Sequence, residues 1–206
     1  MVLSKNMQKL VAGSSTIRKL FEEGIELAKE VGAENVYDFS LGNPAAPVPE
    51  EVKKSIYDIL ENRNANFVHC YMPNAGYPEV REKVAANLNK KYDSSFTKED
   101  IIMTVGAAGG INCVLRCLLE QEDEVLCFAP FFGEYNSYVM NFGGNLKVVP
   151  ADYETFQLNV EEADKYITER TKAVIINNPN NPSGVVYNKE TLIRLQKMLE
   201  KAEERI

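Results

Sequence analysis

The 206-residue sequence has no uninterrupted apolar run of about 18 residues, so it offers no segment that would cross a membrane as a helix. Residues 1–15 have polar side chains at every few positions and no apolar core, which predicts that this stretch is not a signal peptide. Positive charge is scarce too, because 23 Lys and Arg stand against 30 Asp and Glu, for a net charge of −7. Nucleic-acid-binding domains favour basic stripes, so this balance argues against that class.

Residues that bind metals or form disulfides are also few. His69 is the only histidine, and no Cys or His partners cluster around it, so a zinc site is not expected. The four cysteines form no Cys-x-x-Cys pair, and Cys113 and Cys117 lie one helical turn apart beside apolar neighbours. We therefore expect reduced, buried cysteines in a cytoplasmic protein.

Material for a core is abundant, since 45% of the residues are hydrophobic and 26% are charged. A short strand is expected at 36–41, and Pro49 and Pro78 are each expected to open a helix. From residue 101 onward, predicted strands alternate with predicted helices. The strands are expected at 101–105, 124–128, 146–149 and 173–176. The helices are expected at 111–119, 132–141, 160–167 and 189–203, with Asn159 and Asn188 capping the last two. This alternation predicts an α/β fold with a mainly parallel sheet and helices on both faces.

Three turns that follow predicted strands carry residues suited to a ligand. The first, 106–110, contains only Gly and Ala and opens a helix, where free N–H groups favour an anion. The second, 129–135, contains two adjacent aromatic residues that could offer a ring face. The third, 178–184, places the amide of Asn181 between two prolines. Each turn alone also has a plain structural explanation, as a packing turn, as core or as a rigid loop. Because parallel strands end at one edge of a sheet, their joint occurrence favours a small-molecule site.

In this order and spacing the three motifs resemble the class I/II aminotransferases, which are pyridoxal-phosphate enzymes of fold type I. The segments 38–44 and 71–78 look like N-terminal landmarks of the same family, and the resemblance covers nearly all the chain. Within that family, the sequence is most similar to the bacterial aspartate-aminotransferase-like enzymes. The resemblance implies an N-terminal arm and small-domain segment at 1–45, followed at 46–206 by the first part of an incomplete large domain that binds the cofactor.

The resemblance also implies roles for single residues. The backbone N–H groups of Ala107, Ala108 and Gly109 would bind the phosphate of pyridoxal 5'-phosphate. Phe132 would stack on the pyridine ring of the cofactor. Asn181 would form a hydrogen bond with the phenolic oxygen of that ring.

The family likeness further implies contacts with substrate and with a second subunit. Gly42, through its backbone, and Asn181 would contact the amino acid and 2-oxo acid substrates. Tyr71 would reach the phosphate bound by the neighbouring subunit of a homodimer. The family also suggests cis peptide bonds before proline at 129–130 and at 181–182.

In one respect the sequence departs from the family pattern. The Schiff-base lysine, the aspartate that pairs with the ring nitrogen and the two arginines of the family come after the region that matches. The lysines in the second half of this chain are expected on solvated faces: Lys147, Lys165, Lys172, Lys189 and Lys197.

We therefore expect a truncated N-terminal half of an aminotransferase, with no catalytic residue of its own and no activity alone. The segment 101–105 would then lie apart from the other three strands, and strand edges would remain unpaired. Two alternatives are a non-catalytic fragment that binds a phosphate ligand or regulates, and a carbon–sulfur lyase or decarboxylase on the same scaffold. No nucleic acid or membrane is expected as a partner.

Overall fold

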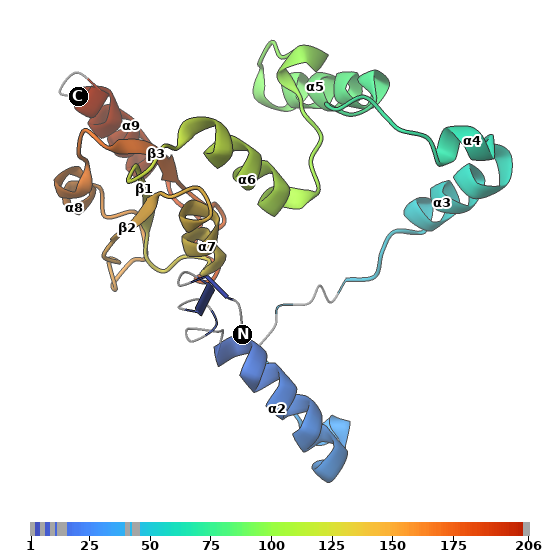
Figure 1. The fold of residues 1–206 in the computed structure, drawn as a ribbon, viewed down its shortest axis with the longest axis horizontal. Coiled ribbons are helices and arrows are strands. Elements are labelled where there is room, and N and C mark those ends of the chain that lie inside the picture. Colours follow the sequence, from blue (N-terminus) through green and yellow to red (C-terminus); the bar gives the residue numbers. More distant parts are fainter. Residues whose placement is uncertain are drawn as a thin grey trace. The chain divides into compact units, whose positions relative to one another are not determined.

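The structure, a computed structural model, describes residues 3–4, 7–8, 11, 16–39, 42 and 46–203. It divides into two compact units, Met1–Tyr71 and Met72–Ile206, and each is considered by itself (Figure 1). The expected division into 1–45 and 46–206 stays a prediction.

The Met1–Tyr71 unit is helical in its described part. Its elements are α2 (Thr16–Val31), the short 3-10 helix η1 (Ala33–Asn35), α3 (Glu50–Asn62) and α4 (Ala65–Val68). The helix expected at Pro49 is present, and Pro49 lies directly before its first residue, at the N-cap position. The strand expected at 36–41 is not found over residues 36–39, and its last two residues lie outside the described part. No strand in the described part of this unit is available to pair with it, and a strand needs such a partner for its backbone groups.

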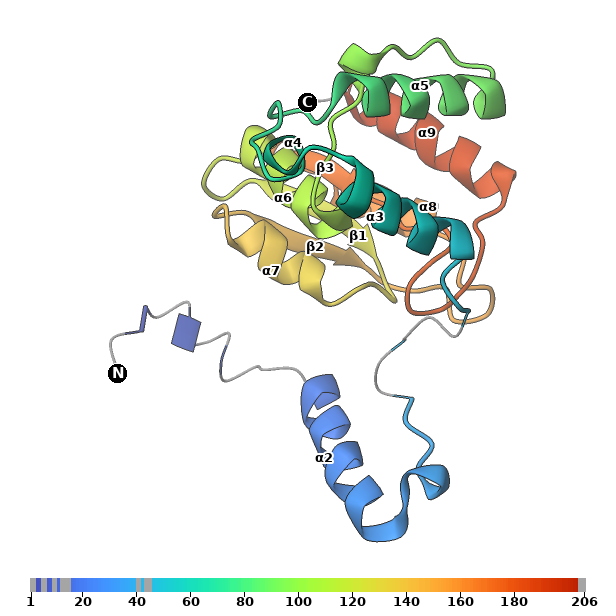
Figure 2. The same ribbon diagram turned by 90° about the vertical axis from the view of Figure 1, so that its right-hand side faces the viewer.

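The Met72–Ile206 unit alternates helices and strands (Figure 2). It begins with α5 (Pro78–Tyr92), which has Pro78 in its first turn, followed by η2 (Lys98–Asp100). The remaining elements are α6 (Gly106–Leu118), β1 (Glu124–Phe128), α7 (Glu134–Met140), β2 (Asn145–Val149), α8 (Val160–Ala163), η3 (Asp164–Tyr166), β3 (Thr171–Ile175) and α9 (Lys189–Glu203). The strands form a parallel sheet in the order β2-β1-β3. The expected caps are confirmed, since the side chains of Asn159 and Asn188 accept backbone N–H bonds at the starts of α8 and α9.

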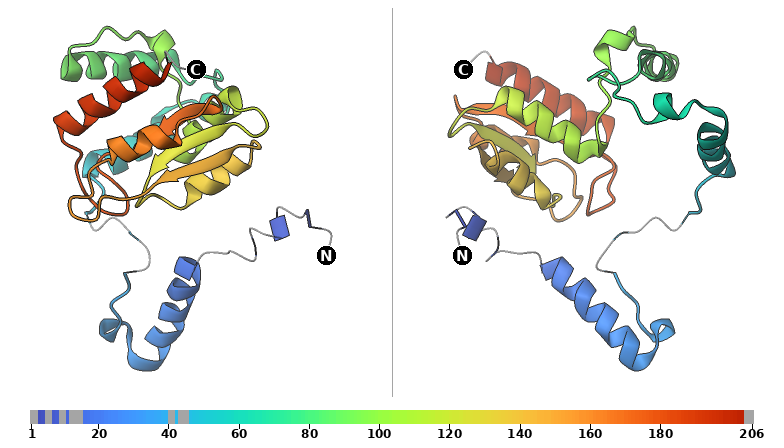
Figure 3. Two further views of the ribbon diagram at one scale, coloured as in Figure 1. Left: turned by 90° about the vertical axis from the view of Figure 1, so that its left-hand side faces the viewer. Right: turned by 45° about the vertical axis from the view of Figure 1, so that its right-hand side comes forward.

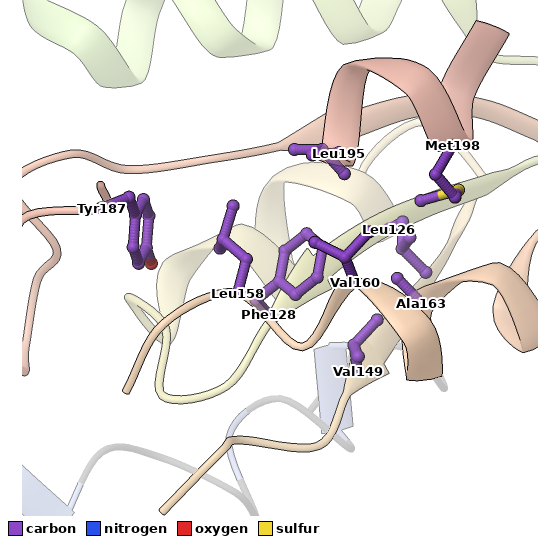
Figure 4. Packing of buried hydrophobic residues seen from close by; sticks show 9 residues of the cluster. All are labelled: Leu126, Phe128, Val149, Leu158, Val160, Ala163, Tyr187, Leu195 and Met198. Carbon is purple, nitrogen blue, oxygen red and sulfur yellow. The ribbon is translucent and has the colours of Figure 1, made fainter. Parts of the chain in front are cut away.

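Helices cover both faces of this sheet, as expected (Figure 3). The central strand β1 is buried at all five positions, which fits its place between two parallel neighbours. On one face, α8 and α9 pack on the sheet through a cluster in which Tyr187 lies at one end (Figure 4). On the other face, Leu115 of α6, Leu119 just after it and Val139 of α7 pack against Val125.

The prediction of a strand at 101–105 is wrong. This segment is extended but unpaired in the described structure, with Ile102 69% exposed and Val105 95% exposed. Its pattern suits a strand, yet none of the three strands lies beside it, and Met103 donates its N–H to the Ala75 carbonyl. As expected, the three other strands form a sheet without it.

The burial of the cysteines was predicted correctly only for Cys127 in β1. Cys113 and Cys117 on α6 are exposed, and so is Cys70. The face of α6 that contacts the sheet carries Ile111 and Leu115, four residues apart. Cys113 lies two residues, or about 200°, further round the helix than Ile111, so both α6 thiols fall on the outer face.

Candidate ligand site at the carboxyl edge of the sheet

Two of the three predicted turns lie together at the carboxyl edge of the sheet. Strands β1 and β3 are parallel neighbours, with Cys127 opposite Ile175, so the segments that follow them leave from the same edge. The Asn180 side chain then joins them, because its Nδ2 donates to the carbonyl oxygen of Pro130 at 3.3 Å. The turns that carry Phe132 and Asn181 are therefore brought together. The carboxyl edge of a parallel sheet is where ligands bind in such folds.

Within the turn 178–184, Asn180 is buried and its side chain is fully hydrogen-bonded. Besides the Pro130 carbonyl, its Nδ2 donates to Tyr187 Oη at 2.9 Å. Its Oδ1 accepts from the backbone N–H of Ser183 at 3.1 Å and from Ser183 Oγ at 2.7 Å. The N–H of Gly184 also donates to the Asn180 carbonyl at 2.7 Å, and the φ of +74° at Gly184 favours glycine there.

The neighbouring residue, Asn181, has the opposite environment. It is exposed, and in the described part of the chain its side chain has no hydrogen-bond partner. An amide with free donor and acceptor groups at this edge is available to a ligand. From the sequence we predicted Asn181 as a ligand contact and did not single out Asn180. Two adjacent asparagines stand between the same prolines, and no pattern signals which of them turns inward.

The Phe132 ring is partly exposed and held from one side by other aromatic rings. It is 37% exposed and meets Tyr135 edge-on, with ring centres 5.7 Å apart and planes at 79°. Tyr135 in turn stacks with Phe131. Burial raises the pKa of Tyr135, because its phenolate would lose contact with water. Tyr135 was not foreseen, although it packs against the ring of Phe132, which was foreseen.

The first turn of α6 supplies backbone N–H groups without a side-chain cap. Ala107 and Ala108 are exposed, Gly109 is half-buried, and Val105 provides no capping bond. Gly106 has a φ of +67°, which a side chain would disfavour. The N–H groups of such a first turn have no partner within the helix and attract anions.

The direction of α6 places this first turn toward the same edge. The helix packs on the sheet through Leu115, and a short connection that begins with Leu119 leads from its last turn to Glu124 at the start of β1 (Figure 3). Helix and strand therefore run in opposite directions, and the start of α6 lies toward the end of β1. This arrangement is compatible with one site for a flat, phosphorylated ligand.

The other predicted site residues belong to the Met1–Tyr71 unit. Gly42 and Tyr71 are both exposed, and their roles stay predictions. The expected cis bonds are confirmed at Ala129-Pro130 and Asn181-Pro182, and Asn178-Pro179 is also cis. In the described residues, no three His, Cys, Asp or Glu side chains gather into a group that could hold a metal, and no helix has the length and apolar character to span a membrane.

Comparison with known proteins gives a consistent result. Residues 33–205 match the family model described as aminotransferase class I and II. The chain is 35% identical to a probable aspartate/prephenate aminotransferase of Aquifex aeolicus, covering 82% of this chain and 42% of that protein. It is 36% identical to aromatic-amino-acid aminotransferase 2 of Thermococcus litoralis, covering 93% and 47%. The chain thus spans about half the length of the curated relatives that it matches.

Solved structures agree. An amino transferase from Eubacterium rectale superposes with a TM-score of 0.95 at 40% identity, over 100% of this chain and 52% of that one. The aspartate aminotransferase from Thermus thermophilus with maleate superposes with a TM-score of 0.84 at 30% identity, over 98% and 51%. The expected fold class is confirmed. The chain belongs to the class I and II aminotransferase family.

Proposed function

We propose that this chain is the cofactor-binding N-terminal half of a pyridoxal-phosphate-dependent aminotransferase. The complete enzyme would move an amino group between an amino acid and a 2-oxo acid and would act as a homodimer. The observation that carries the proposal is the Asn180–Pro130 hydrogen bond, which joins the turns of Phe132 and Asn181 at the carboxyl edge of the sheet.

The exposed groups at this edge fit the chemistry of pyridoxal phosphate. Phe132 offers a ring face to a pyridine ring, and Asn181 offers an unused amide to the phenolic oxygen. The N–H groups of Ala107, Ala108 and Gly109 suit a phosphate. When bound, the cofactor supplies an electron-withdrawing ring and a carbonyl carbon that carries the amino group.

Two further contacts are proposed for the complete enzyme. Gly42 would bind the substrate carboxylate through its backbone N–H. Tyr71 would bind the phosphate in the neighbouring subunit. Its exposed hydroxyl is free to do so in the described structure.

The chain alone should bind the cofactor without catalysing transfer. Transamination needs an amine that holds the cofactor and moves the proton. In the described part of the Met72–Ile206 unit, no strand places a lysine at the carboxyl edge. Lys147 pairs with Glu124 at the start of β1, with 3.1 Å between Nζ and Oε1, and Lys172 is the second residue of β3.

Titration with pyridoxamine 5'-phosphate tests the proposal, because this ligand carries its own amine and needs no lysine. Phe132→Ala should weaken binding about 3- to 10-fold, the value of an aromatic pair. Asn181→Ala should weaken it about 10- to 100-fold, the value of a hydrogen bond to a charged group.

Two variants serve as matched controls and should bind as the unsubstituted chain does. Phe96 is 47% exposed and lies between α5 and η2, outside the segments that follow the strands. Asn87 is an exposed amide on α5. The proposed site is refuted if the unsubstituted chain shows no saturable binding. It is also refuted if Phe96→Ala and Asn87→Ala weaken binding as much as Phe132→Ala and Asn181→Ala do. Transamination by the chain alone would refute its expected inactivity.

A further inference from the structure

We propose that Asn180 is a positioning residue of this site, which sets the amide of Asn181 relative to the ring of Phe132. The proposal rests on the proposed cofactor site and adds a residue that need not touch the ligand. It makes the site depend on a buried side chain.

The hydrogen bonds of Asn180 permit only one orientation of its amide. The side chain has two N–H donors and two acceptor positions, and all four are used, by Pro130, Tyr187 and Ser183. Turning the amide over would place Oδ1 against the Pro130 carbonyl and Nδ2 against the Ser183 N–H. Both contacts would be lost in a residue that is only 6% exposed, so the reversed orientation is strongly disfavoured.

One of these bonds connects parts of the chain that are far apart in sequence. The bond from Nδ2 to the Pro130 carbonyl spans 50 residues. In the described structure it is the single side-chain hydrogen bond between residues 129–132 and 178–184. Pro130 precedes Phe132 by two residues, and Asn180 directly precedes Asn181. Both groups proposed to hold the ring are therefore close to this bond.

The other bonds of Asn180 act within its own turn. Its backbone N–H donates to the Val185 carbonyl at 2.9 Å, and its Oδ1 accepts the two bonds from Ser183. Asn181 has no such ties, so the direction of its side chain depends on its backbone. Asn180 fixes that backbone locally and attaches it to the turn of Phe132.

Three variants separate the bond between the turns from the bonds within one turn. Asn180→Asp keeps an acceptor for Ser183 but loses both donors. Ser183→Ala and Tyr187→Phe each remove a local partner of Asn180 and keep the donor to Pro130. The probe is pyridoxamine 5'-phosphate, and the readouts are its affinity and the pKa of its ring phenol, followed by absorbance when bound.

Asn180→Asp should weaken affinity about tenfold. It should also move the phenol pKa toward the value of the free ligand, in the same direction as Asn181→Ala. Ser183→Ala and Tyr187→Phe should stay within about twofold of the unsubstituted chain and keep its phenol pKa. A purely structural role of Asn180 would lower stability without this spectroscopic change.

Hydrogen exchange gives a measurement that needs no variant. If Asn180 orders the turn before the ligand arrives, the N–H groups of Ser183 and Gly184 should exchange slowly in the ligand-free chain. Rapid exchange of both would overturn the proposal, even if Asn180→Asp fails to fold.

The remaining outcomes distinguish this inference from the proposed function. Binding by the unsubstituted chain together with equal affinity and phenol pKa for Asn180→Asp would overturn the positioning role alone. A complete lack of binding by the unsubstituted chain would overturn the proposed function, and the positioning role with it.

Discussion

The buried thiol of Cys127 should make the protein less stable at alkaline pH. Cys127 lies in the central strand β1 and is only 1% exposed. Burial raises the pKa of this thiol from 9.0 to about 12, because the thiolate would be stripped of water. The unfolded chain therefore loses this proton at a lower pH than the folded chain.

The sign and size of the effect follow from this difference in pKa. A raised pKa in the folded state leaves stability intact below about pH 9 and removes it as the pH rises toward 12. Each pH unit within that interval costs about 1.4 kcal/mol, so the whole interval is worth about 4 kcal/mol. Between pH 8 and pH 10, the unfolding free energy should fall by about 1 kcal/mol because of Cys127.

Urea unfolding at both pH values, under reducing conditions, measures this loss when Cys127→Ala is included as the reference. Burial also raises the pKa of Tyr135 and Tyr187, which are present in both proteins. Tyr187 cancels in the comparison, and Tyr135 cancels except for the smaller effect that Cys127 itself has on it. The unsubstituted chain should lose about 1 kcal/mol more than Cys127→Ala. Equal losses in the two proteins would refute the reasoning.

Three further predictions concern the packing of the Met72–Ile206 unit, and each is checked by urea or thermal unfolding. Leu126→Ala should lower the free energy of unfolding by about 2–5 kcal/mol, because Leu126 is fully buried. Ile193→Ala, at a position 40% exposed, should lower it much less, and similar losses would contradict the assigned core. Asn188→Ala should cost about 1 kcal/mol by removing the N-cap of α9, and an unchanged midpoint would argue against that cap. Lys147→Met should lower the free energy of unfolding by about 1–3 kcal/mol, because it leaves the carboxylate of Glu124, a residue 8% exposed, without its cation. An unchanged free energy of unfolding would mean that water solvates this carboxylate.

The sheet could be predicted from the sequence because its signals are local. The stretch 124–128 is apolar after its first residue, and the structure has β1 over the same five residues. Asn159 and Asn188 precede helices at the expected positions, since a capping amide needs only the backbone of the next turn.

The segment 101–105 shows where local signals are insufficient. Its residues have the composition of a strand, but a strand is completed by hydrogen bonds to a neighbour, and composition does not specify that neighbour. The helix α2 was overlooked for a different reason. Its apolar residues, such as Phe21 and Ile25, recur at helical spacing, but they are interspersed with charges, and no proline opens the helix.

The candidate site was foreseen in part. The sequence identified Phe132 and Asn181, which are exposed and carry the expected chemistry. It did not identify Asn180 or Tyr135, which hold those residues in place from below the surface. Their contacts join segments distant in the chain, and only the folded backbone determines which of two adjacent amides is buried.

The outward position of Cys113 and Cys117 on α6 provides attachment points for a fluorescent label. Cys113 lies five residues after Ala108, which corresponds to about 7.5 Å along a helix. A dye attached there, after Cys70 and Cys117 have been replaced, would lie on the exposed face of α6, within two helical turns of its start. The sequence thus contains an anchor for a dye that would report whether phosphate-bearing molecules bind at the proposed site.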